Sequence, residues 1–134
     1  RLADARHDTA DMGNPHLVVL VPDLAQVDLV GTGSWLEQQF AAGVNVEFIA
    51  PADEPDCIDL LVWERGAGVT EACGTGAVAA ASLAHRWGLV GREVRVSMPG
   101  GSAEIVLGDD DRPDDEPVLI GPAQRVATIE VADA

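Results

Sequence analysis

The sequence has few positive charges. Its 134 residues include 8 Lys and Arg against 23 Asp and Glu, which gives a formal net charge of −15 at pH 7. Nucleic acids and anionic membrane surfaces attract proteins through positive charge, so this balance argues against both as partners. Apolar runs are short as well, and none approaches the roughly 18 residues that a membrane-spanning helix needs. The sequence therefore predicts neither a nucleic-acid-binding protein nor a membrane protein.

Cysteine is scarce too. Only Cys57 and Cys73 occur, and two cysteines do not build the disulfide framework of a small secreted domain. No basic segment followed by an apolar one marks a secretory signal. We therefore expect a reducing, cytoplasmic location. The length is that of one domain, and the start at Arg1 rather than Met suggests a piece of a longer protein or a processed chain.

Common nucleotide and metal signatures are also missing. The Gly66-Ala67-Gly68 segment lacks the third glycine of a dinucleotide fingerprint, and no lysine follows these glycines as it would in a phosphate-binding loop. The acidic run from Asp109 to Glu116 lacks the spaced glycine and the terminal Glu of a calcium loop. We interpret this run as a solvated turn, so no metal site is predicted.

Apolar, β-rich stretches bounded by Gly, Pro and Asp predict a series of strands. They cover residues 17–21, 43–49, 57–63, 93–98, 103–107, 118–120 and 126–131. The strand over 43–49 alternates, with Val44, Val46 and Phe48 on one face and Asn45, Glu47 and Ile49 on the other. Asn is disfavoured inside strands, so Asn45 indicates either the polarity of an edge strand or an amide that faces a cleft.

Helices are fewer. The polar segment Arg1 to Asp11 has no periodicity and is predicted to be a frayed end or the stub of a connection. Gly31-Thr32-Gly33 is predicted to be a turn before Ser34 and Glu37, a capping-box pair that starts a short helix through Phe40. The helix predicted from Thr75 to Trp87 is apolar almost all round, which is typical of a helix buried inside a domain, and Gly88 ends it.

These elements predict an α+β fold, in which a curled and mostly antiparallel sheet wraps around one buried central helix. Such an arrangement accounts for the single long helix better than repeated βαβ units, which need several helices of similar length. We expect residues 1–134 to form a single domain.

The most informative stretch runs from Trp63 to Gly76, where an apolar strand ends in Glu64 and Arg65 and a glycine-rich loop leads to Cys73. Cys73 opens the long helix, and the dipole and free N–H groups of a helix start lower the pKa of a thiol. That setting predicts a nucleophile or a proton carrier, although a buried packing role remains an alternative at this stage. Cys57 has acidic neighbours that do not favour a thiolate, so we interpret it as structural. His16, at the mouth of a strand, is by itself more typical of a surface residue.

Five motifs resemble those of the diaminopimelate epimerase family, in the same order and at the same spacing. They are Gly13-Asn14-Pro15-His16, Gly43-Val44-Asn45-Val46-Glu47-Phe48, Glu64-Arg65-Gly66-Ala67-Gly68, Ala72-Cys73-Gly74-Thr75-Gly76-Ala77 and Met98-Pro99-Gly100-Gly101. The resemblance covers nearly the whole chain, but only the C-terminal half of the family's enzyme. The family's N-terminal half, with its own Cys-Gly-Asn-Gly motif, is not in this sequence. Leu17 and Val69 depart from the usual Cys and Glu of the family, at positions to which we assign no chemistry.

The resemblance implies a reaction and a set of site residues. The family inverts one α-carbon of LL-diaminopimelate to give the meso isomer, a step of lysine and peptidoglycan precursor biosynthesis, with neither pyridoxal phosphate nor a metal. A thiolate removes the α-proton and a thiol on the opposite face returns one. By resemblance, Cys73 is one of these two groups, and Glu64 and His16 lie near the ammonium group at the reacting centre.

The remaining roles follow from the same resemblance. The N–H groups of Gly74, Thr75 and Gly76 would hold the α-carboxylate. Arg65 would hold the distal carboxylate, with Asn14 and Asn45 contacting the distal end.

Partners and alternatives follow as well. The resemblance implies a small-molecule substrate, diaminopimelate, and an N-terminal half as partner. We expect this chain alone to be inactive. Residues 121–134 are predicted to cross to the missing half, or else to stay disordered or pair with a second copy in a homodimer.

A non-catalytic amino-acid-binding or interaction module is an alternative function, and a related isomerase of the same fold is another. Arg65, Asn14 and Asn45 argue against the second alternative, because they suit a substrate with two amino-acid ends.

Overall fold

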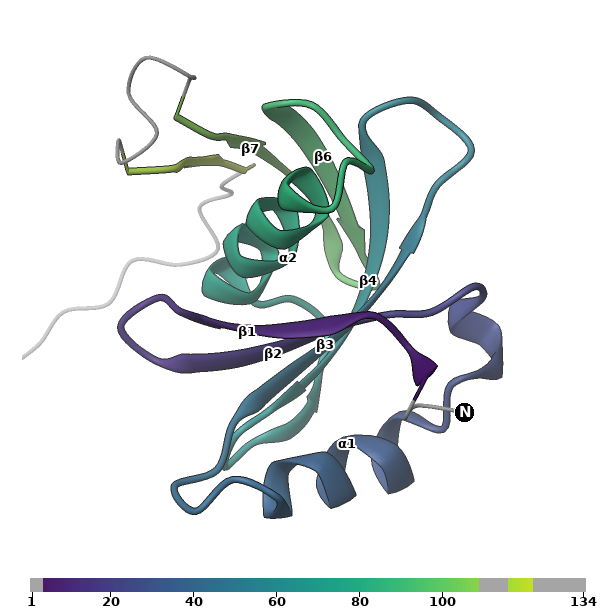
Figure 1. Ribbon diagram of the computed structural model, residues 1–134, viewed down its shortest axis with the longest axis vertical. Helices are drawn as coiled ribbons and strands as arrows, with labels where there is room; N and C mark the ends of the chain where they lie inside the picture. Colours follow the sequence, from purple (N-terminus) through teal and green to yellow (C-terminus); the bar gives the residue numbers. More distant parts are fainter. Residues whose placement is uncertain (1–3, 109–115, 122–134) are drawn as a thin grey trace, which may run out of the picture.

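The computed structural model describes residues 4–108 and 116–121 of the chain. Its strands form one sheet in the order β1-β2-β3-β4-β6-β7-β8, with β5 paired to β4 beside this path (Figure 1). The strands are β1 (His7–Asp11), β2 (Pro15–Leu20), β3 (Asn45–Pro51), β4 (Cys57–Glu64), β5 (Gly68–Thr70), β6 (Glu93–Met98), β7 (Gly101–Val106) and β8 (Val118–Ile120). The helices are α1 (Leu29–Gln38) and α2 (Gly74–Arg86), with a short 3-10 turn η2 (Leu24–Gln26) before α1.

Helix α2 lies against the concave side of the sheet, between the β1–β2 hairpin and strands β6 and β7 (Figure 1). Its inner side is built from small residues: Ala77, Ala79, Ala80, Ala81 and Ala84 are all buried. Small side chains let the sheet approach the helix closely, and larger ones from the strands, such as Ile49, Ile58 and Ile105, fill the space between them. The predicted curled sheet around a buried helix is therefore confirmed.

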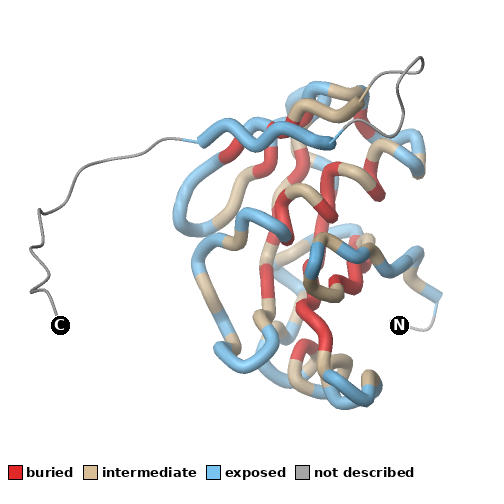
Figure 2. The backbone as a smooth tube through the Cα atoms, turned by 90° about the vertical axis from the view of Figure 1, so that its left-hand side faces the viewer, coloured by how far each residue is buried: buried red, intermediate tan, exposed pale blue. Residues whose placement is uncertain are grey.

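The opposite face of the sheet carries a second apolar cluster beneath α1 and η2. Val44, Val46 and Phe48 belong to this cluster, whereas Ile49 packs on the α2 side, so the predicted alternation is confirmed. Strand β3 lies in the middle of the sheet and is buried along nearly all its length. Buried residues run through the middle of the molecule (Figure 2). The edge-strand interpretation of Asn45 is therefore wrong.

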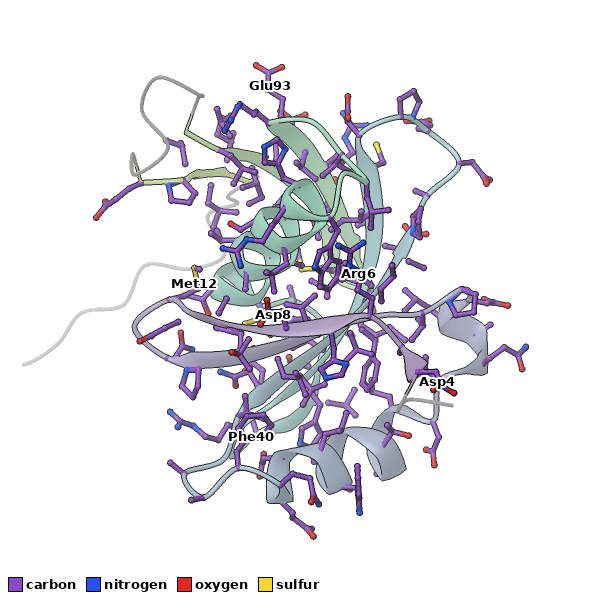
Figure 3. All side chains as sticks on the ribbon, viewed as in Figure 1. Asp4, Arg6, Asp8, Met12, Phe40 and Glu93 are labelled. Atoms are coloured by element: carbon purple, nitrogen blue, oxygen red, sulfur yellow. The ribbon has the colours of Figure 1, made fainter. Side chains whose placement is uncertain are left out.

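The predicted frayed end at residues 1–11 is wrong for the residues that the structure describes. His7–Asp11 forms β1, which pairs antiparallel with β2. Gly13, at φ +90, allows the tight turn that brings β1 back onto its partner. The Arg6 guanidinium lies 5.3 Å from the Trp87 ring centre and so helps to fix this segment, whose Arg6 and Asp8 side chains are labelled in Figure 3. Polar composition concealed β1 because most of its side chains face solvent.

The predicted turn at Gly31-Thr32-Gly33 is also wrong, because α1 begins earlier than expected. Asp28 is the N-cap residue, and its carboxylate accepts a hydrogen bond from the Gly31 N–H at 3.1 Å. Gly33 is inside the helix and buried, since a Cβ there would lie only 2.7 Å from Trp63 Cβ. Here glycine permits close packing of a helix on a strand rather than a turn.

Two connections are parallel crossovers rather than hairpins. β2 pairs parallel with β3 after α1, and β4 pairs parallel with β6 after α2. The other pairings are antiparallel, as predicted.

Neither α1 nor α2, the helices in the described part of the chain, has the length and apolar character needed to cross a membrane. The predictions for residues 109–115 and 122–134, including the strand 126–131 and most of the acidic run, lie outside the described residues.

Candidate active site

Cys73 is the N-cap residue of α2. Its extended backbone, at φ −147 and ψ 113, turns the chain into the helix, and its Sγ accepts a hydrogen bond from the Gly76 N–H at 3.3 Å. The Thr75 hydroxyl lies 3.7 Å from the same sulfur. The first N–H groups of an α-helix have no partner within the helix, so the Gly74-Thr75-Gly76 segment offers donors at this end of α2. The sequence-based placement of Cys73 at a helix start is confirmed.

The predicted direction of the Cys73 pKa is wrong. Burial raises the pKa of the half-buried thiol above its ordinary value, and the neighbouring Glu64 raises it further. The Gly76 N–H and the Thr75 hydroxyl lower the pKa, but they do not outweigh burial. In this structure Cys73 therefore holds its proton at neutral pH. The helix terminus is visible in the sequence, whereas the desolvation of the sulfur and the nearness of the Glu64 carboxylate arise only in the folded protein.

The loop before Cys73 is held by the turn between β6 and β7. The Gly100 N–H donates to the Glu71 carbonyl at 2.9 Å. A Cβ on Gly100 would lie 3.1 Å from Glu71 Cβ, so only glycine allows this approach without displacement. The Met98-Pro99-Gly100-Gly101 motif thus positions the cysteine loop.

His16 is fully buried at the start of β2, which the surface interpretation of the isolated residue did not anticipate. Its Nδ1 lies 2.7 Å from Oε1 of Glu47, and its Nε2 lies 3.1 Å from Oδ1 of Asn14. Asn14 in turn donates through Nδ2 to the Thr75 hydroxyl at 3.4 Å. A continuous line of contacts therefore joins the sheet interior to the residues around Cys73.

Glu47 is the residue at this site that sequence reasoning did not assign. It is fully buried in the centre of β3, and its Oε1 would lie 2.7 Å from a Cβ on Gly76. Burial raises the pKa of the Glu47 carboxyl, and the contact with His16 opposes that rise without cancelling it. The sequence held one signal for Glu47: it is an acidic residue in the middle of a mostly apolar strand, on the same face as Asn45.

Asn45 and Arg65 belong to a neighbouring cluster. The Asn45 side chain is nearly buried; it donates to the Pro15 carbonyl at 3.1 Å and accepts from the Arg65 N–H at 2.7 Å. Arg65 is exposed, and its Nη1 donates to the Ala42 carbonyl at 3.1 Å. Asn45 thus fixes the backbone where β4 ends in Glu64 and Arg65. Substrate contacts by Asn45 and Arg65 stay predictions.

Strand β4 separates the two cysteines. Cys57 is its first residue and Glu64 its last, so Cys57 lies at the end away from the site. Its sulfur is 4.0 Å from Oε2 of Glu54.

The fold and this constellation define a class: an α+β protein whose curled sheet presents a cysteine at the start of its central helix, beside buried His and Glu and a strand-end Glu and Arg. Residues 9–126 match the diaminopimelate epimerase family. The chain belongs to this family.

Named relatives support the assignment. A diaminopimelate epimerase of Rhizorhabdus wittichii is 46% identical over 123 residues, which cover 90% of this chain and 43% of that relative. One from Bacteroides thetaiotaomicron is 48% identical over 96 residues, covering 70% of this chain and 36% of the relative. The chain thus spans less than half the length of these curated relatives.

Solved structures show the fold. A Bacillus anthracis phenazine biosynthesis protein of the PhzF family has a TM-score of 0.58 and 17% identity, over 86% of this chain and 38% of the other. A PhzF-family protein from Enterococcus faecalis gives 0.58 and 14%, over 78% of this chain and 39% of the other. At these identities the likeness supports the fold alone.

Proposed function

We propose that this chain is the Cys73-bearing half of an enzyme that epimerises LL-diaminopimelate to the meso isomer. The observation that carries the proposal is Cys73 at the start of α2, with its sulfur beside two hydrogen-bond donors and within the influence of Glu64. Such a thiol can exchange a proton with a carbon acid, and the adjacent helix terminus stabilises the negative charge that develops on the substrate carboxylate.

In the proposed reaction, a thiolate from the other half removes the α-proton and becomes a thiol. Cys73 delivers its own proton to the opposite face of the carbanion and becomes a thiolate. One C–H bond breaks and one forms, with no net oxidation. Burial and Glu64 raise the pKa of Cys73, which favours Cys73 as the group that starts with a proton in this direction.

Other residues take the roles that the family resemblance implies. Glu64 and His16 lie near the reacting centre, and Gly74, Thr75 and Gly76 bind the α-carboxylate. Arg65 binds the distal carboxylate as a bidentate donor, with Asn14 and Asn45 nearby. The reaction needs no pyridoxal phosphate and no metal, and the proposed location is the cytoplasm.

The test combines this chain with the N-terminal half of a named relative. LL-Diaminopimelate is incubated in deuterated water, and both the isomer ratio and α-deuterium are followed. We expect the two halves together to produce the meso isomer and this chain alone to produce none. Cys73→Ser should lower the rate about 10²-fold or more, as the loss of a general acid does. Cys57→Ser is the matched control and should keep the activity. Sustained conversion by this chain alone would refute the two-thiol assignment.

A non-catalytic binding module is the second candidate. It is favoured by the single thiol that this chain brings to the site, Cys73, where the reaction needs two; Cys57 lies at the other end of β4. In that case calorimetry would detect diaminopimelate binding to the assembled halves, while α-deuterium would never appear.

A further inference from the structure

Glu47 is an unusual residue for the centre of a sheet. It is a fully buried carboxyl with apolar neighbours along β3, and one of its oxygens, Oε2, has no hydrogen-bond partner among the described residues. Burial of a polar atom without a partner costs free energy. Glu47 therefore weakens the fold locally, and its other oxygen, Oε1, must account for its presence.

That other oxygen determines where protons lie on His16. Both ring nitrogens of His16 face oxygen atoms: Nδ1 faces Glu47 Oε1 at 2.7 Å and Nε2 faces Asn14 Oδ1 at 3.1 Å. The amide oxygen of Asn14 can only accept, so Nε2 must carry a proton. A second proton lies between Nδ1 and Oε1. Whichever of these two atoms holds it, the pair is neutral overall and Nε2 remains a donor.

The hydrogen bonds continue from His16 through Asn14 and Thr75 to Cys73. With its oxygen occupied by His16, Asn14 presents Nδ2 to the Thr75 hydroxyl at 3.4 Å. The hydroxyl oxygen accepts this bond, so its own hydrogen is free to point at Cys73 Sγ, 3.7 Å away. If Nε2 of His16 carried no proton, each of these hydrogen bonds would run in the opposite direction. The Thr75 hydrogen would then point to Asn14 instead of Cys73.

We propose that Glu47 is a positioning residue that orients the His16–Asn14–Thr75 hydrogen bonds so that the Thr75 hydroxyl donates to the Cys73 sulfur. The importance of this for catalysis rests on the proposed function, but the orientation itself does not. Glu47 touches neither the cysteine nor a bound substrate in this scheme. It acts by supplying the proton that Nδ1 needs, which leaves Nε2 as the donor.

The first measurement reads the proton positions directly. ¹⁵N chemical shifts of the imidazole, recorded on the folded chain between pH 6 and 8, distinguish a protonated from an unprotonated Nε2. We expect Nε2 of His16 to be protonated throughout this range. An unprotonated Nε2 would overturn the proposal, regardless of whether the chain has epimerase activity with its other half.

The second measurement uses variants and an internal reference. Glu47→Gln keeps a donor for Nδ1 through its amide, so Nε2 should stay protonated and the alkylation of Cys73 should change less than two-fold. Glu47→Leu removes the donor; we expect the Cys73 rate at pH 8 to fall about five-fold, the worth of one neutral hydrogen bond, and its pH profile to move upward. Cys57, labelled in the same molecule, reports on unfolding.

The outcomes separate positioning from simple packing. The proposal is supported if Cys73 in Glu47→Leu is alkylated more slowly while the alkylation rate of Cys57 is unchanged. Both alkylation rates should be normal in Glu47→Gln. Equal Cys73 rates in the two variants would overturn it. If Glu47→Leu exposes both cysteines by unfolding, the decision rests on Glu47→Gln, where an unprotonated Nε2 or a Cys73 rate five-fold below the original would overturn the proposal.

Discussion

The side chain of Glu47 occupies the space that a methyl group on Gly76 would need. An ideal Cβ on Gly76 would lie 2.7 Å from Glu47 Oε1 and 3.2 Å from Cys73 Sγ. The first turn of α2 therefore fits against the His16–Glu47 pair only because residue 76 has no side chain. Close approach of a helix start to a buried carboxyl is what brings the cysteine, the hydroxyl and the histidine into one line of contacts.

Gly76→Ala should disrupt this arrangement. We expect a loss of about 1–3 kcal/mol in the free energy of unfolding, the usual cost of overpacking a core. Urea denaturation measures the loss. Gly74→Ala is the matched control, because its Cβ would meet, among the described residues, only Leu119 Cδ2 at 3.3 Å. Equal stability of the two variants would contradict the close approach of Gly76 to Glu47.

The Cys73 pKa responds to two neighbours in opposite directions. Glu64 raises it and the Thr75 hydroxyl lowers it. Glu64→Gln should therefore increase the rate of Cys73 alkylation at pH 7 several-fold, because a larger fraction of the thiol is ionised. Thr75→Val should slow the same reaction. Peptide mapping by mass spectrometry follows each cysteine, and Cys57 serves as the reference. A slower reaction in Glu64→Gln would show that the carboxylate does not act on the sulfur as described.

The same Glu64→Gln change should affect catalysis in the other direction. In the two assembled halves, we expect slower epimerisation even though the thiol is more reactive, because the proposed role of Glu64 is at the substrate. The measurement is the rate of α-deuterium incorporation. A rise of that rate in parallel with alkylation would mean that Glu64 only tunes the thiol.

The Glu47 carboxyl predicts an unusual pH dependence of stability. Most buried carboxylates in ion pairs have a lowered pKa, but burial raises that of Glu47. The folded state then binds a proton more readily than the unfolded state, so this contribution is complete at low pH. It is lost as the pH rises above about 4.3, the ordinary value for Glu. The free energy of unfolding relative to Glu47→Gln should therefore fall as pH rises from 4 toward neutral. A rise over that interval would contradict the raised pKa.

Gly33 tests the close packing of α1 on the sheet. Alanine normally favours a helix by about 1 kcal/mol over glycine. Here its Cβ would lie 2.7 Å from both Cβ and Cγ of Trp63, so Gly33→Ala should instead destabilise the protein by about 1–3 kcal/mol. In a Trp63→Ala background the same change should cost less, which a double-mutant cycle measures. Purely additive costs would show that the two residues are not in contact.

Sequence pattern alone determined most of the architecture. The apolar runs predicted the strands from β2 to β8 except β5, which forms inside the predicted glycine-rich loop, and the alanine-rich segment after Cys73 predicted α2 with its end at Gly88. Gly88, at φ +78, donates to the His85 carbonyl, and Leu89 donates to that of Ala84, as a glycine-terminated helix requires. These features are local, so a short stretch of sequence contains their physical cause. The family motifs likewise pointed to His16, Glu64 and Cys73 as candidate site residues, and their roles stay predictions.

Tertiary structure decided the rest, because the deciding neighbours are distant in sequence. β1 forms from polar residues only because β2 is there to pair with it. Gly33 belongs in a helix because Trp63, thirty residues later, lies against it. The pKa of Cys73 is raised chiefly by the burial of its sulfur, which outweighs the donors at the helix terminus; Glu64, across the glycine loop, adds to the rise. The partnership of His16 with Glu47 arises because neighbouring parallel strands bring together residues that the sequence separates by a whole helix.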